Sequence, residues 1–383
     1  MNWDFDAIVD RRCTCSEKWD NYPGAPDALP MWVADMDFTA PQEVLDALRE
    51  RVDHGVFGYS CPPPESRQIA CDWRRQRSGH DVRPEWVVFS AGVVCSIKAA
   101  IQAFTAPGDA VVVQTPVYPP FLMAPAHEGR RVVRNPLRCE NDRWLMDLDD
   151  LEGHFRAGAR FMLLCSSHNP VGRVWTAQEL AELAALCQRY EVLVVSDEIH
   201  CDILRPGQRH TALAALPGMQ DRVITCASTT KSFNLAGLQN SVAFAADEGI
   251  RERLRRELYR CNHSEPNLFG MLAQNAAWQH GGPWLDALNI YIAANADLAL
   301  GVLGGQDRIS ATQPEGTYLL WVDCTALGLD EPALLDFFVQ RCRVFPTMGK
   351  PYGAPGFVRL NLATRRALVE EGVGRILEGL KEI

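Results

Sequence analysis

The sequence of 383 residues lacks the cysteine and histidine spacings that mark disulfide frameworks and metal sites. Its 13 cysteines are odd in number and scattered, and no C-x-x-C pair occurs among them. None of the 9 histidines lies in an H-E-x-x-H pattern. We therefore expect reduced, mostly buried thiols and no bound metal.

Long apolar runs and an excess of positive charge are also missing. No stretch of about 18 apolar residues occurs, so no transmembrane helix is expected. The opening MNWDFDAIVDRR is acidic and mixed, unlike a secretory signal, which predicts a cytoplasmic protein. With 48 acidic against 38 basic residues, the formal net charge is −10. This charge argues against nucleic acid or an anionic membrane as a general partner.

What the sequence does contain is an alternation of short apolar runs with longer amphipathic stretches. The expected strands are 87–89, 110–113, 161–164, 192–195, 223–225 and 241–245. Continuous apolar strands separated by helices indicate an α/β fold with a mostly parallel sheet covered on both faces. We expect a large domain over residues 48–283, and a smaller α+β domain formed by residues 1–47 and 284–383.

Residues suited to ligand binding follow five of these strands. In an open parallel sheet such residues meet beyond the carboxyl ends of the strands. In chain order they are Gly92, Val93 and Val94; Tyr118; Asn169; Asp197; and Ser228, Thr230 and Lys231. An anion-suited turn, an aromatic ring, an amide, a carboxylate and a lysine at one edge are the parts that a pyridoxal 5′-phosphate (PLP) site requires.

The chemistry of PLP gives each of these residues a role. Lys231 supplies the amine for a Schiff base with the cofactor aldehyde. Asp197 keeps the pyridine nitrogen protonated, so that the ring can absorb the electrons of a carbanion. The amide of Asn169 donates to the 3′-oxygen of the ring, and Tyr118 stacks on its face.

The phosphate and the substrate need anion-binding groups. Backbone N–H groups of Gly92, Val93 and Val94 at a helix start suit the phosphate, and hydroxyls of Ser228 and Thr230 can add to them. An amino-acid substrate carries a carboxylate that the planar fork of Arg359 can hold.

Each residue taken alone also has a plainer interpretation. Lys231 and Arg359 would be solvated surface residues, and Asp197 would cap a helix. Asn169 would belong to an Asn-Pro-x-Gly turn, and Tyr118 would be a core aromatic. Only their combination at one sheet edge favours the PLP site.

The combination resembles fold-type I PLP enzymes of the aspartate aminotransferase superfamily over nearly the whole chain. The matching motifs, in order, are Asn169-Pro-x-Gly, Ser196-Asp197-Glu198, Ser228-x-x-Lys231 and Arg359. The resemblance implies a three-layer α/β/α domain with a mostly parallel seven-stranded sheet, plus a smaller α+β domain.

Two departures from the common aminotransferase pattern point to one branch. His200 stands where many have a tyrosine, and the segment 236–239 lacks their phosphate-binding arginine. With the segments 31–38 (MWVADMDF) and 57–59 (FGY), these departures look like the MalY/PatB-type cystathionine β-lyase (C–S lyase) branch. The resemblance implies that His200 lies in the cofactor site. It also implies a homodimer in which Tyr59 of one subunit reaches the cofactor and substrate of the other.

The activity implied by this branch is α,β-elimination on a cysteine S-conjugate, which yields pyruvate, ammonia and a thiol. Lys231, Tyr118 and Asp197 are the candidate catalytic residues. An amino acid aminotransferase shares the same site residues and stays an alternative. A nucleotide-dependent enzyme is disfavoured because no G-x-G-x-x-G follows a strand and no glycine precedes Lys231-Ser232. A non-catalytic regulatory protein is disfavoured because the full set of cofactor residues is present.

Overall fold

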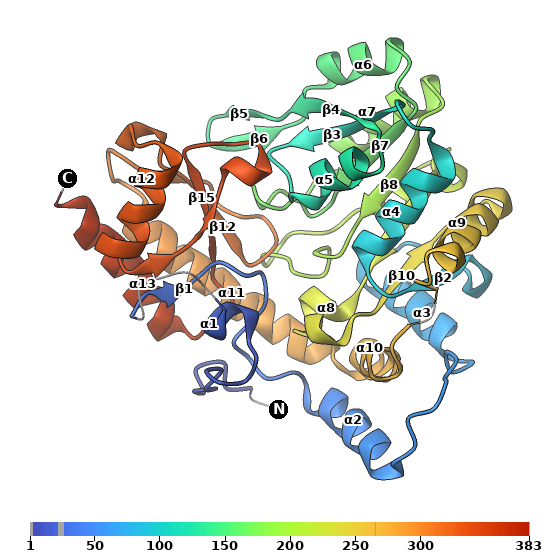
Figure 1. Ribbon diagram of the computed structural model, residues 1–383, viewed down its shortest axis with the longest axis horizontal. Coiled ribbons are helices and arrows are strands. Elements are labelled where there is room, and N and C mark those ends of the chain that lie inside the picture. The colour runs from blue at the N-terminus through green and yellow to red at the C-terminus, as the bar shows by residue number, and fades with distance from the viewer. Residues whose placement is uncertain (1–2, 22–26, 265, 383) are drawn as a thin grey trace.

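The computed structural model describes residues 3–21, 27–264 and 266–382, and predictions for residues 1–2, 22–26, 265 and 383 lie outside the described residues. A seven-stranded sheet forms its centre (Figure 1). In spatial order the strands are β2 (Val87–Ser90), β10 (Ser241–Phe244), β9 (Val223–Ala227), β8 (Leu193–Asp197), β7 (Phe161–Cys165), β3 (Ala110–Thr115) and β4 (Arg131–Pro136).

Neighbouring strands in this sheet are parallel except where β10 is involved. Strand β10 runs antiparallel to both β2 and β9, whereas the other four pairings are parallel. The predicted mostly parallel seven-stranded sheet is therefore confirmed. All residues of β7 and β9 are buried, as expected of strands covered on both faces.

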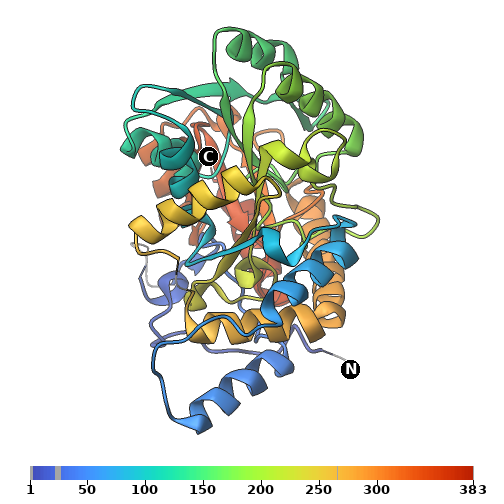
Figure 2. The same cartoon turned by 90° about the vertical axis from the view of Figure 1, so that its right-hand side faces the viewer.

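Helices cover both faces of the sheet and give three layers (Figures 1 and 2). On one face pack α4 (Val93–Phe104), α5 (Pro120–His127) and α9 (Glu248–Arg260), which share one apolar cluster with the strands. On the other face pack α3 (Ser66–Ser78), α6 (Leu148–Arg156), α7 (Ala177–Arg189) and α10 (Leu268–His280). The predicted three-layer α/β/α arrangement is confirmed.

A second, four-stranded antiparallel sheet lies to the side of the first, in the orange and red part of Figure 1. Its order is β11 (Ser310–Ala311), β12 (Leu319–Asp323), β15 (Phe357–Asn361) and β14 (Thr347–Met348). Helices α11 (Gly282–Leu303), α12 (Glu331–Asp336) and α13 (Arg366–Leu380) accompany it. The smaller elements are α1 (Glu17–Asp20), α2 (Gln42–His54), α8 (Thr229–Ser232), β1 (Leu29–Pro30), β13 (Val344–Phe345), β5 (Arg138–Glu140) and β6 (Arg143–Leu145).

The segment before α2 packs with the C-terminal part of the chain. Strand β1 pairs in parallel with β13, and Met31 is buried in the same cluster as β12, β15 and α13. A second cluster joins Met36 and Trp284 to Trp73 and Phe233, so the core is continuous across the expected boundary. The division into 48–283 and 1–47 with 284–383 stays a prediction.

Helix α11 is the one helix in the described ranges that is long and apolar enough to cross a membrane, judged by length and composition alone. Its side chains Leu285, Leu288, Ile292 and Leu303 are buried within the protein. Central core helices pass the same test of length and composition.

Candidate active site

The carboxyl ends of β7, β8 and β9 are aligned at one edge of the central sheet. In the register, Asp197 lies opposite Cys165 of β7 on one side and Cys226 of β9 on the other. Asn169 follows β7 within four residues, and Ser228 begins α8 directly after β9. The parallel topology therefore brings Asn169, Asp197 and Lys231 to the same edge, as the sequence predicted.

The Lys231 side chain lies between the two sheets and contacts the N-terminal segment. Its Nζ donates to the carbonyl oxygen of Ala34 at 2.6 Å, and the Tyr318 hydroxyl donates to the same oxygen at 2.9 Å. Burial, aided by the charge of Arg359, lowers the pKa of Lys231 to about 8, although Asp35 and Asp197 oppose the shift. About a tenth of the amine is then neutral at pH 7, against well under about a thousandth for an ordinary lysine, and the neutral amine is the form that attacks an aldehyde.

Asp197 is a buried carboxyl group with an incomplete set of partners. Its Oδ1 accepts the backbone N–H of Ile199 at 3.0 Å. Burial raises the pKa of Asp197 to about 7, and the neighbouring Glu198 adds to the shift while Lys231 opposes it. A protonated nitrogen placed against this carboxyl would stabilise its charged form. The side chain thus caps a turn, not the helix of its plainer interpretation, and it is also suited to bind a cationic ring nitrogen.

Arg359 fixes the orientation of Asn169. Nη1 of Arg359 donates to Oδ1 of Asn169 at 3.1 Å, so the Nδ2 donor of the amide points away from the guanidinium. Nη2 donates to the Trp32 carbonyl oxygen at 2.9 Å and lies 3.3 Å from Thr347 Oγ1. Arg359 is buried, which excludes the solvated interpretation. Its Nε is buried without a hydrogen-bond partner among the described residues, a feature that a substrate carboxylate would satisfy.

Tyr118 and His200 border the same space. The backbone N–H of Tyr118 donates to the Asn169 carbonyl oxygen at 3.1 Å, and burial raises the pKa of its hydroxyl. His200 is buried edge-on to Tyr318, with ring centroids 5.8 Å apart. Burial and the charges of Lys231 and Arg359 hold the pKa of His200 well below its usual value. Its imidazole is therefore neutral and able to donate one hydrogen bond.

Of the groups expected to bind the phosphate, the backbone N–H groups at the start of α4 have no side-chain cap, whereas the Ser228 hydroxyl already makes hydrogen bonds within the protein. Gly92 is the N-cap of α4 and brings no side-chain cap, which leaves the first N–H groups of the helix, including those of Val93 and Val94, open to an anion. The Ser228 hydroxyl donates to the Asn240 carbonyl oxygen at 2.6 Å and accepts the Thr230 N–H at 3.1 Å. The hydroxyls of Ser228 and Thr230 are 2.9 Å apart, so both lie at the start of α8.

Tyr59 is not brought to these residues within one chain. It lies in the stretch between α2 and α3, and its side chain is fully exposed, as is much of Phe57 beside it. Such an exposed position is open to contact with a second subunit.

Sequence reasoning missed the part played by the segment 31–38, which passes between the two sheets. Asn361 Nδ2 donates to the carbonyl oxygens of Val33 and Asp35 at 2.5 and 2.6 Å, and Asn234 accepts the N–H of Met36 at 2.9 Å. Arg11 pairs with Asp35 at 2.7 Å. These contacts place the Ala34 carbonyl against Lys231. The MWVADMDF motif was the available signal, but the sequence did not indicate which atom would matter.

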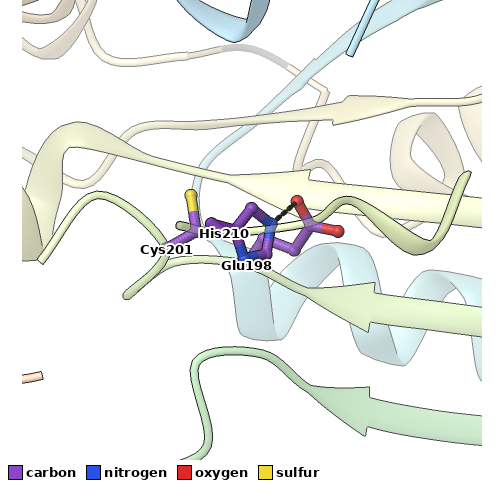
Figure 3. A group of neighbouring side chains, drawn as sticks. All are labelled: Glu198, Cys201 and His210. Carbon is purple, nitrogen blue, oxygen red and sulfur yellow. Dashed lines mark hydrogen bonds and ion pairs between the residues drawn. The ribbon is translucent and has the colours of Figure 1, made fainter. Parts of the chain in front are cut away.

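Behind Asp197 lies a buried polar group formed by Glu198, Cys201 and His210 (Figure 3). Nε2 of His210 is 2.8 Å from a carboxylate oxygen of Glu198. The three ligand atoms lie within 4.8 Å of one another, a spacing that could hold a metal ion. However, the Arg74 guanidinium pairs with Glu198 and donates to Cys201 Sγ at 3.4 Å. A cation already fills the position that a metal would take.

The donor set fits PLP. Four features each match one group of the cofactor: the Lys231 amine with its lowered pKa, the buried Asp197 carboxyl with no ion pair to a described residue, the Asn169 amide whose Nδ2 donor is turned away from Arg359, and the open N-terminus of α4. The unpartnered Nε of Arg359 matches the carboxylate of an amino acid.

Comparison with known proteins agrees with this assignment. The family model of aminotransferase class I and II matches residues 28–376. Cystathionine beta-lyase PatB of Bacillus subtilis is 40% identical over 98% of this chain and 99% of its own length. Cystalysin from Treponema denticola, whose structure contains pyridoxal 5′-phosphate, superposes with a TM-score of 0.96 at 31% identity over the full length of both chains. The PLP-bound C–S lyase from Staphylococcus hominis gives 0.93 at 31% identity over 99% and 98% of the two chains.

Proposed function

The chain belongs to the aminotransferase class I and II family, and from this premise we propose that it is a PLP-dependent C–S β-lyase. Its substrate would be cystathionine or another cysteine S-conjugate, and its products pyruvate, ammonia and a thiol. The observation that carries the proposal is the buried Lys231 amine, whose pKa is lowered to about 8 by burial and by the charge of Arg359, at the sheet edge that also holds Asp197. When bound, PLP supplies the electron sink for the carbanion formed at the α-carbon.

Lys231 would act twice, first by holding the cofactor covalently and then by moving a proton. Once released from the cofactor, the Lys231 amine would be free to take the α-proton of the substrate. The hydrogen bond from Lys231 Nζ to the Ala34 carbonyl oxygen supports this role, because that oxygen can hold the amine in place when it is not bound to the cofactor. A base with a pKa of about 8 is close to the value that serves proton transfer at neutral pH.

The other residues would bind and orient. Arg359 holds the substrate carboxylate, and Asn169, oriented by Arg359, donates to the cofactor 3′-oxygen. Asp197 holds the proton on the ring nitrogen. Tyr118 stacks on the ring, and neutral His200 adds a hydrogen-bond donor beside Lys231. Water is kept from these groups by burial of Arg359, Asp197 and His200.

Product analysis tests the lyase assignment against the aminotransferase alternative. The purified holoenzyme is supplied with cystathionine and no keto-acid acceptor, and pyruvate and free thiol are followed in time. We expect both products in equal amounts over many turnovers. A keto acid that appears only after an acceptor is added would instead establish an aminotransferase.

We further propose a homodimer in which Tyr59 completes the partner's site. The support is its full exposure, together with exposed Val52, Val56 and Phe57 on the same stretch, an apolar group that a second copy would cover. Co-purified hybrids of a Lys231→Ala chain and a Tyr59→Ala chain should carry one site with both residues intact. We expect the hybrid to recover up to half of the wild-type activity, while each parent stays far below it. A hybrid no more active than its parents would rule out shared sites.

A cytoplasmic location completes the proposal. All 13 cysteines are free, and four of them, Cys13, Cys15, Cys61 and Cys139, are exposed. Exposed unpaired thiols suit a reducing compartment.

A further inference from the structure

A buried ion pair lies directly behind Asp197 and takes no part in the proposed reaction. Arg74 of α3 pairs with Glu198, the residue that follows Asp197, and both side chains are almost fully buried. The Glu198 carboxylate also accepts from the Ser196 hydroxyl at 3.0 Å and contacts Nε2 of His210 at 2.8 Å. In Figure 3 the His210 ring points at this carboxylate from the neighbouring loop.

The residue beside Arg74 extends the contact to the helix that carries Lys231. Nε1 of Trp73 donates to Oδ2 of Asp202 at 2.9 Å, and the Ser232 hydroxyl lies 3.5 Å from the same oxygen. Two consecutive residues of α3 thus reach the turn after Asp197, and that turn reaches α8. Helix α3 is therefore linked to the segment after Asp197 directly and to the helix that carries Lys231 through Asp202.

Stability alone does not account for a buried ion pair at this place. Removing two charges from water costs about as much as their attraction returns, and apolar substitutes are often as stable. The Arg74–Glu198 pair does, however, neutralise the negative charge of Glu198 beside Asp197. Arg74 and His210 lower the pKa of Glu198 to about 2 in spite of its burial, so Glu198 is a fixed negative charge next to Asp197. A second carboxylate at such a site disfavours ionisation of the first unless a cation compensates it.

We propose that Arg74 and Glu198 are positioning residues for Asp197. Their ion pair holds the end of β8, and the guanidinium cancels the Glu198 charge, so that the proton shared by Asp197 and the cofactor ring stays on the ring nitrogen. This inference rests on the proposed binding of PLP. The other titratable groups that face the pair are His80, His210, Cys201 and Asp202, and none of them supplies a permanent positive charge in place of Arg74.

The test reads the position of the proton directly. Holoenzyme is reconstituted with PLP labelled with nitrogen-15 in the ring, and the ring-nitrogen resonance is recorded at pH 7.5. We expect the protonated position for the wild type and a displacement toward the unprotonated position for Arg74→Gln, which keeps a hydrogen-bond donor but loses the charge. Pyruvate release should fall about tenfold or more, as a shift of one pKa unit implies.

Three matched variants separate charge from packing. Arg74→Lys keeps the charge and should keep the protonated resonance. Arg74→Gln with Glu198→Gln removes both charges and should return the resonance to the protonated position. Arg251→Met removes another buried arginine, which among the described residues donates to the backbone carbonyls of Ala245 and Ala246, and it should leave the resonance unchanged.

Two outcomes overturn the inference. One is an Arg74→Gln protein with the wild-type resonance, whatever its stability. If that variant does not fold, Glu198→Gln decides, because it leaves Arg74 uncompensated and should raise the pH at which the ring nitrogen loses its proton. No such rise in a pH titration of the resonance, or a fall, is then the contradicting result. A wild-type protein with no bound-cofactor resonance would instead refute the proposed function.

Discussion

Replacing Lys231 with alanine is expected to lower kcat/KM for pyruvate release from cystathionine by at least about 10⁴-fold. The loss is this large because the amine both exchanges with the substrate amine and moves the α-proton, and proton transfer alone contributes about 10²–10⁴-fold. Steady-state pyruvate release with PLP in excess gives the measurement. Of the titratable side chains at this sheet edge, Lys231 alone combines a primary amine with a pKa near 8.

The matched control for this substitution is Lys98→Ala. Lys98 is exposed on α4, the helix whose N-terminus faces the expected phosphate position, so its loss removes a lysine from the same part of the protein. We expect unchanged activity. A Lys231→Ala enzyme that retains more than a few per cent of the wild-type kcat/KM would place the essential amine elsewhere.

Replacing Asp197 with asparagine is expected to lower kcat by about 10²–10³-fold, the usual cost of removing one preorganised electrostatic group from an active site. Asparagine keeps an oxygen for the N–H of Ile199, so the local turn should survive. It cannot carry the negative charge that holds the proton on the ring nitrogen. Because the change acts on the chemical step, KM should move much less than kcat.

Asp247→Asn is the control for loss of a capping carboxylate. Asp247 accepts the N–H of Ile250 at 2.7 Å at the start of α9, which follows the antiparallel β10 at the sheet edge opposite to that of Lys231. This substitution should leave kcat unchanged. An Asp197→Asn enzyme with near-normal kcat would show that the carboxyl serves only to cap the local turn.

Most of the central sheet could be predicted because its inner strands are continuous apolar runs bounded by polar turns. Strand β4 was missed for a physical reason. It lies at the sheet edge, and in it Arg131 and Arg134 are exposed while only Val133 and Asn135 are buried. Because exposed arginines alternate with the buried residues, the segment lacks the continuous apolar run by which a buried parallel strand is predicted.

The chemical groups of the site were predictable, but several of their contacts were not. Asn169, Asp197 and Lys231 could be placed together because parallel strands end at a common edge. The contact of Arg359 with Asn169 joins residues 190 positions apart, and that of Lys231 with Ala34 joins residues 197 apart. No local pattern encodes such pairs. The role proposed for Tyr59 would require a second chain, so neither a local sequence pattern nor the fold of one subunit can reveal it.

The central claim, a covalent bond between Lys231 and PLP, is tested most directly by borohydride reduction of the yellow holoenzyme followed by peptide mapping. Reduction converts the Schiff base into a stable amine that survives proteolysis. We predict a single pyridoxyl-modified peptide, and it should contain Ser228-Thr229-Thr230-Lys231 with the modification on Lys231. A colourless protein, or a modified lysine at any other position, would contradict the account.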